Sequence, residues 1–125
     1  MMLPIIDASP AFRPKWEEFL AEWQDEDELP VYLVLSDLAR HMADLERAAK
    51  VSELKSIFAV IESWHTDGDP YVREAATIGM LEDLQNTNLT GESSRAFEAY
   101  LGPESRRWWK KVERFWEHGE LIRDD

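Results

Sequence analysis

Apolar residues recur at helical spacing along most of this 125-residue chain. After Pro14 they follow the i, i+3, i+4, i+7 pattern of one helical face, at Trp16, Phe19, Leu20 and Trp23. Proline has no amide hydrogen, so it fits the first helical turn, where that group would have no partner. We therefore expect a first helix over roughly 14–24.

The same spacing predicts two longer helices in the next part of the chain. The first covers roughly 30–49, with a buried stripe at Leu35, Leu38, Met42 and Leu45. Residues 31–35 alone have the composition of a buried strand, but the periodicity that continues to Leu45 favours a helix. The second covers roughly 52–66, with Ser52 as its N-cap.

The sequence Asp67-Gly68-Asp69-Pro70 is a strong signal for a turn and a new helix. We expect Asp69 to cap that helix, Pro70 to occupy its first position, and the helix to end near Asn86. Its inner face has small residues that would let a neighbouring helix approach closely, at Ala75, Ala76 and Gly79.

A short helix is expected near 97–101, followed by an amphipathic helix from Pro103 that ends at Gly119. The expected inner stripe of the amphipathic helix is Trp108, Val112, Phe115 and Trp116. Trp109 lies off that stripe, so we expect a partly exposed contact residue, of a type common in protein interfaces. The whole pattern predicts an all-α bundle of five to six helices in a single domain covering 1–125.

The net charge of the chain argues against some classes of binding partner. The chain has 14 basic and 26 acidic residues, a formal net charge of −12, which opposes binding to nucleic acid and to anionic membranes. Cysteine is absent, which excludes disulfides and cysteine-based zinc sites. The N-terminal residues lack the basic region of a signal peptide, and no apolar run approaches the ~18 residues of a membrane span, so we expect a cytoplasmic protein.

No catalytic motif stands out. His41, His65 and His118 are spread along the chain, and the serines show no nucleophile-elbow motif. His65 lies near Asp67 and Asp69, but this spacing matches neither a zinc helix motif nor a calcium loop. We therefore expect a protein that is not an enzyme and holds no metal or cofactor. A metal-dependent enzyme that uses His65, Asp67 and Asp69 is a minor hypothesis.

Four consecutive acids, Asp25, Glu26, Asp27 and Glu28, follow the first predicted helix. Because like charges repel, we expect an exposed connector there. The connector either keeps the protein soluble or docks a basic protein, since complementary charge speeds encounter and orients partners. Asp67 and Asp69 are candidates to extend such a surface. The full set of candidate partner-binding residues is Asp25, Glu26, Asp27, Glu28, Asp67, Asp69 and Trp109.

The last predicted helix is basic, with Arg106, Arg107, Lys110, Lys111 and Arg114 interleaved with tryptophans. Basic residues beside aromatic ones are typical of nucleic-acid binding. The alternative is an amphipathic helix whose bases pair with acids elsewhere in the protein, and the acidic charge of the whole chain favours it.

Residues 69–76 read Asp-Pro-Tyr-Val-Arg-Glu-Ala-Ala, and leucines follow at 81 and 84. This segment resembles the second helix of a HEAT repeat, with the predicted helix 52–66 as its partner. The resemblance implies a HEAT-like antiparallel helix pair at 52–86. No second copy is present in the sequence, whereas a repeat solenoid needs about three stacked units.

Two stretches carry a wider resemblance: residues 71–86, and Leu101 to Ser105 with the aromatic pairs Trp108-Trp109 and Phe115-Trp116. On these residues the chain resembles a family of small, acidic, all-helical bacterial proteins that are similar to immunity proteins. The resemblance implies a protein that binds and neutralises one toxin stoichiometrically. Many such toxins cleave nucleic acid and are therefore basic. An inhibitor can block such an enzyme by presenting carboxylates that mimic the phosphates of its substrate. The alternative hypothesis is a helical adaptor in another intracellular assembly.

Overall fold

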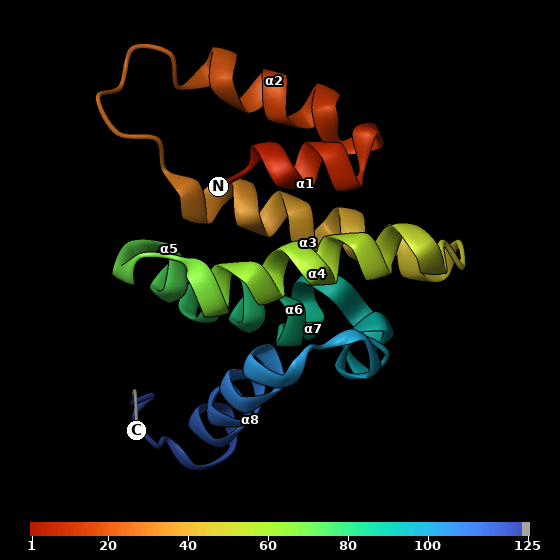
Figure 1. The fold of residues 1–125 in the computed structure, drawn as a ribbon, viewed down its shortest axis with the longest axis vertical. Helices are drawn as coiled ribbons and strands as arrows, with labels where there is room; N and C mark the ends of the chain where they lie inside the picture. The colour runs from red at the N-terminus through yellow and green to blue at the C-terminus, as the bar shows by residue number, and fades with distance from the viewer. Residues whose placement is uncertain (124–125) are drawn as a thin grey trace.

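Two long helices, α3 (Val31–Arg47) and α4 (Val51–Asp67), form the centre of the fold. The computed structural model describes residues 1–123, and that part of the chain contains helices and no strand. The helices α1 (Leu3–Ala8) and α2 (Arg13–Glu22) lie on one side of α3 and α4, and α8 (Pro103–His118) lies on the other (Figure 1). The prediction of an all-α protein is confirmed, but the described residues contain more helices than the five to six predicted, because α1 and α7 were not expected.

The segment predicted as one helix from Pro70 is continuous but changes its winding. It begins as α5 (Pro70–Glu74), continues as a π-helix over Ala75–Leu81, and ends as α6 (Glu82–Gln85). The connection to α8 contains α7 (Thr87–Thr90) and two short 3₁₀ helices, Gly91–Arg95 and Phe97–Tyr100. Within residues 1–123, no helix is both long enough and apolar enough to cross a bilayer.

Most predicted helix ends agree with the structure. Asp69 caps α5, because its Oδ1 accepts a hydrogen bond from the backbone N–H of Val72 at 2.9 Å. Gly119 ends α8 in the left-handed conformation, with φ of 69°, which glycine adopts without strain. The predicted cap Ser52 is wrong, because α4 begins at Val51, after Lys50, and Ser52 lies inside the first turn.

The pattern did not predict α1, which a partly buried polar cluster fixes to the two central helices. Ser9, at the end of α1, is fully buried. Its Oγ lies 2.8 Å from Nε2 of His41 on α3 and donates to the Glu53 carboxylate on α4 at 2.5 Å. Because a buried hydroxyl needs a partner, these two contacts fix the place where α1 ends.

The hydrophobic core depends on a close approach between α3 and the π-helix. Ala75, Ala76 and Gly79 are all buried on the side of the π-helix segment that packs inward, as predicted. A Cβ built on Gly79 would lie 2.8 Å from Cδ1 of Leu35 and 3.1 Å from Cδ1 of Tyr32. The missing side chain of Gly79 therefore lets α3 lie directly against the π-helix backbone.

The structure corrects the predicted orientation of α8. Trp109 is only 4% exposed and belongs to the core, so the expectation of an exposed contact residue was wrong. Trp116, predicted to be buried, is 55% exposed. The inner face of α8 runs through Ser105, Trp109 and Val112, because Ser105 is held against α4 by polar contacts.

This orientation predicts opposite effects of two tryptophan truncations in the same helix. Trp109→Ala should lower the free energy of unfolding by about 3–5 kcal/mol, because it leaves a cavity in the core. Trp116→Ala should change it by less than about 1 kcal/mol, because the side chain is largely in solvent. Urea unfolding of both variants measures the difference, and equal losses would contradict the orientation of α8.

Candidate functional site

The acidic connector between α2 and α3 is exposed along its whole length. Asp25, Glu26, Asp27 and Glu28 are all exposed, as predicted. Their side chains form no hydrogen bond or ion pair with any of residues 1–123. Folding therefore leaves four adjacent negative charges without internal neutralisation.

The turn between α4 and α5 adds two more carboxylates, and both are exposed. Asp67 is the last residue of α4, and Asp69 caps α5 while its side chain stays at the surface. The turn and the acidic connector lie on the same side of the molecule, the left side of Figure 1. The structure thus places six of the seven candidate residues on that side, and Trp109 lies in the core.

An apolar surface that the sequence pattern did not identify lies beside these acids. Tyr32 at the start of α3 is near Tyr71, Glu74 and Glu82. Partial burial raises the pKa of the Tyr32 phenol, and the charges of these neighbours raise it further. Tyr71, Glu74 and Ile78 recur at three- and four-residue spacing along α5 and the π-helix, and Tyr71 and Ile78 are exposed. The π-helix is relevant here, because π-helical turns are frequent at functional sites.

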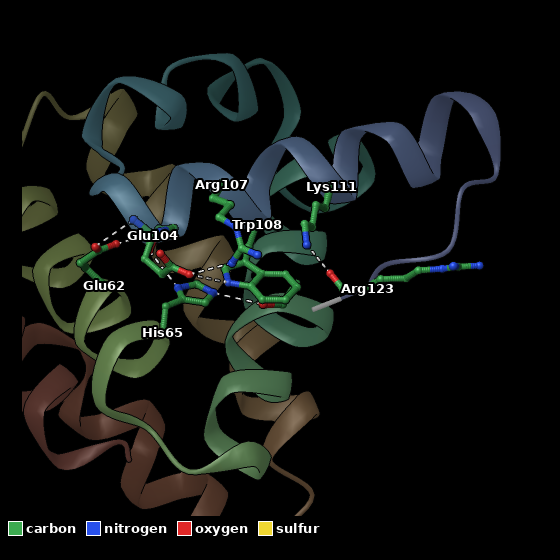
Figure 2. A network of polar contacts seen from close by, with 9 residues as sticks. Glu62, His65, Glu104, Arg107, Trp108, Lys111 and Arg123 are labelled. Atoms are coloured by element: carbon green, nitrogen blue, oxygen red, sulfur yellow. Dashed lines mark hydrogen bonds and ion pairs between the residues drawn. The ribbon is translucent and has the colours of Figure 1, made fainter. Parts of the chain in front are cut away.

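A second polar region joins α4 to the beginning of α8 (Figure 2). The Glu62 carboxylate accepts hydrogen bonds from the backbone N–H groups of Glu104, at 3.0 Å, and Ser105, at 2.8 Å. Burial alone would raise the pKa of Glu62, but the hydrogen bonds from Ser105 and Glu104 outweigh it and lower the pKa. Glu62 therefore caps α8 from another helix, where a negative charge also meets the positive end of the helix dipole.

His65 connects the same helices from inside the protein. Its Nδ1 lies 2.9 Å from Ser105 Oγ, and its Nε2 lies 3.1 Å from Thr77 Oγ1 in the π-helix. Burial lowers the pKa of His65 to about 4, so the ring is neutral at pH 7. A hydroxyl beside a histidine is also the geometry of an activated nucleophile. Thr77 is 4% exposed and both ring nitrogens have partners, so the network joins α4, the π-helix and α8. His65 and Thr77 also line a cavity between α5, the π-helix and α8.

His65, Asp67 and Asp69 do not converge on a metal site. The His65 ring is directed into the protein, while both aspartates are at the surface. Across residues 1–123, no three histidine, aspartate or glutamate side chains are grouped so that they could hold a metal ion.

A cavity of about 670 Å³ lies between α5, the π-helix and α8. Charged groups of both signs line it, including Arg73, Glu74, Glu104 and Arg107, and the Trp108 ring forms part of its wall. Cations of the same helix lie over that ring, with Lys111 Nζ at 4.4 Å and Arg107 Cζ at 5.0 Å from its centroid. In addition, Arg107 pairs with Glu104 of α8 itself and Arg114 pairs with Glu120 just after the helix, whereas the prediction placed the partners of these bases elsewhere in the protein.

The comparison with known families covers almost the whole chain. The model of a family described as a domain of unknown function, DUF7674, matches residues 2–117. The chain belongs to this family. The match includes the acidic connector, the turn at 67–69 and the polar region around His65. No curated protein and no solved structure matches the chain.

The buried His65 predicts a specific loss of stability in acid. Its pKa is about 4 in the folded protein and 6.5 ordinarily, so the unfolded chain takes up the proton first. Stability should therefore fall by up to roughly 3 kcal/mol as the pH drops from 6.5 to 4. Urea unfolding across this range should show a shallower pH slope for His65→Gln, whereas the exposed His118→Gln should keep the wild-type slope. Equal slopes for all three proteins would contradict the account of His65.

Gly102 tests the cap on α8. A Cβ at this position would lie 2.5 Å from Cδ of Glu62. Gly102→Ala should therefore displace the Glu62 carboxylate from its two hydrogen-bond donors, the backbone N–H groups of Glu104 and Ser105. We expect a loss of about 1–3 kcal/mol of unfolding free energy, measured by thermal or urea unfolding. In a Glu62→Ala background the same substitution should cost much less, because the clashing group is gone. If Gly102→Ala lowers the free energy of unfolding equally in that background, the clash with Glu62 does not explain the loss.

Proposed function

We propose that this chain is an immunity-type protein, which binds a cognate basic bacterial toxin in the cytoplasm and neutralises it without chemistry of its own. The observation that carries this proposal is the acidic connector Asp25–Glu28, whose four side chains are exposed and have no hydrogen-bond or ion-pair partner in the described part of the chain. Four adjacent charges repel one another, and a positively charged partner relieves that repulsion.

The distribution of charge supports one binding side. Residues 25–34 and 67–83 contain nine acids and only one base, Arg73, a balance of −8 out of the formal −12. Complementary charge raises the association rate and orients the partners before contact. Exposed carboxylates also occupy the phosphate sites of a nuclease, so a toxin that cleaves nucleic acid is the partner class that this surface suits best.

A helical adaptor is the second candidate, and one structural feature favours it. Helix α4 is followed by the segment α5–π-helix–α6, which packs against it, and we propose that the two act as a HEAT-like pair. Helix pairs of this type present extended surfaces to protein partners. Genomic context separates the two candidates, since an adjacent gene for a large secreted toxin is expected only for an immunity protein.

Charge reversal in the connector tests the proposed function. With the adjacent-gene toxin as analyte, Glu26→Lys/Glu28→Lys should lower the association rate by about tenfold or more at low salt. The effect should become small at high salt, because ions screen the exposed charges. Stopped-flow or surface plasmon resonance measurements at two ionic strengths would show both effects.

The matched control is Glu92→Lys/Glu117→Lys, which makes the same change in net charge outside the acidic segments, at two exposed positions. This variant should slow association much less than the connector variant. If both variants slow association equally, only net charge matters and the connector is not the binding site. If neither does so, electrostatic binding to this partner is excluded.

A further inference from the structure

Exposed hydrophobic side chains are concentrated beside the acidic connector. Half of the large hydrophobic side chains that are exposed in residues 1–123 come from two short segments, 29–33 and 71–78. They are Leu29, Tyr32, Leu33, Tyr71 and Ile78. Single exposed hydrophobic residues are ordinary, but a group of them rimmed by polar residues is typical of a binding surface.

The close packing at Gly79 brings these two segments together. The Tyr32 ring lies against the π-helix at Gly79, and its phenol is within electrostatic range of Tyr71. Tyr71 is 54% exposed and Tyr32 is 39% exposed, so both rings present area to solvent. We call Tyr32 and Tyr71 the tyrosine face; Leu29 and Leu33 extend it along the chain towards the connector. Ile78 is next to Gly79 in the chain and lines the cavity between α5, the π-helix and α8.

The negative charge around the tyrosine face determines which kind of partner can bind there. Glu74 and Glu82 lie beside Tyr32, and the connector and the turn at 67–69 add six further carboxylates on the same side of the molecule (Figure 1). A second copy packed through the same face, a nucleic acid or an anionic membrane would bring negative charge to this side and be repelled. A basic protein segment carrying an exposed aromatic or aliphatic side chain meets both requirements.

We propose that the tyrosine face is the contact centre for the basic partner: an aromatic or aliphatic side chain of a basic segment packs on Tyr32 and Tyr71, and flanking arginines or lysines face the surrounding carboxylates. This inference rests on the proposed function and identifies where binding energy, as distinct from association rate, arises. Tyrosine and tryptophan dominate interface hot spots, and tyrosine faces also attract arginine by cation–π contact. Rim charges, by contrast, mainly alter association rates.

Two synthetic peptides of equal positive charge separate these contributions. Both carry arginines and lysines, and their central residue is tryptophan in one and serine in the other. In an NMR titration of the whole chain at low salt, we expect the tryptophan peptide to bind about tenfold more tightly and to shift the resonances of Tyr32 and Tyr71. The serine peptide should shift mainly the connector resonances, because only its charges contribute.

Substitutions at the face then decide the proposal. Tyr71→Ser should lower affinity for the tryptophan peptide by about tenfold and leave the serine peptide unchanged. The control Leu121→Ser removes another exposed hydrophobic side chain, outside the segments 29–33 and 71–78, and should change neither affinity. Tyr32→Ser should act like Tyr71→Ser, with circular dichroism to verify folding because Tyr32 also packs on the π-helix; Tyr71→Ser does not depend on that contact.

The outcomes distinguish the inference from the function on which it rests. If both peptides bind equally well and Tyr71→Ser has no effect, the tyrosine face is not the contact centre, although the acidic side still binds basic partners. If neither peptide binds at low salt, the electrostatic basis of the proposed function fails as well. If sedimentation at high salt shows a dimer that Tyr71→Ser abolishes, the occupant is a second copy and the inference is overturned.

Discussion

The close contact between α3 and the π-helix at Gly79 is the constraint on which the proposed binding surface depends. Because Gly79 has no side chain, Leu35 and Tyr32 lie directly against the helix backbone. The contact places the start of α3 beside the π-helix, with Tyr32 near Tyr71 of α5, so the end of the acidic connector lies on the same side as the turn at 67–69 (Figure 1). The acids and the exposed tyrosines consequently share one side of the protein, although about 40 residues separate them in the sequence.

Local patterns predicted much of the fold because they depend on nearby residues. The three- and four-residue spacing identified α3 and α4, and the Asp69-Pro70 pair identified the start of α5. The pattern failed where long-range contacts decide the result. Helix α1 has only six residues, too few for a clear period, and Ser9 holds it through partners on α3 and α4.

The candidate site shows the same division between local and long-range information. The exposure of Asp25–Glu28 follows from mutual repulsion of adjacent charges, and the sequence was sufficient to predict it. The opposite exposures of Trp109 and Trp116 were not predictable, because two rotations of α8 fit its apolar spacing and the contacts of Ser105 with Glu62 and His65 select one. Residue type alone also left Tyr32 and Tyr71 unassigned, since tyrosines occupy cores and surfaces alike.

The polar region around Glu62 and His65 and the acidic connector have different roles in this protein. The hydrogen bonds of Glu62 and His65 are formed within the protein and stabilise the junction of α4, the π-helix and α8. The carboxylates of the connector form no hydrogen bond or ion pair within residues 1–123 and are open to a partner.

Hydrogen–deuterium exchange on the complex isolated from the native host tests most directly whether the connector and the tyrosine face bind the partner. The account predicts a basic protein partner and protection of amides within 25–34 and 71–79, with little change in α8. Protection confined to α8 around Trp116, or a complex without a basic protein, would contradict it.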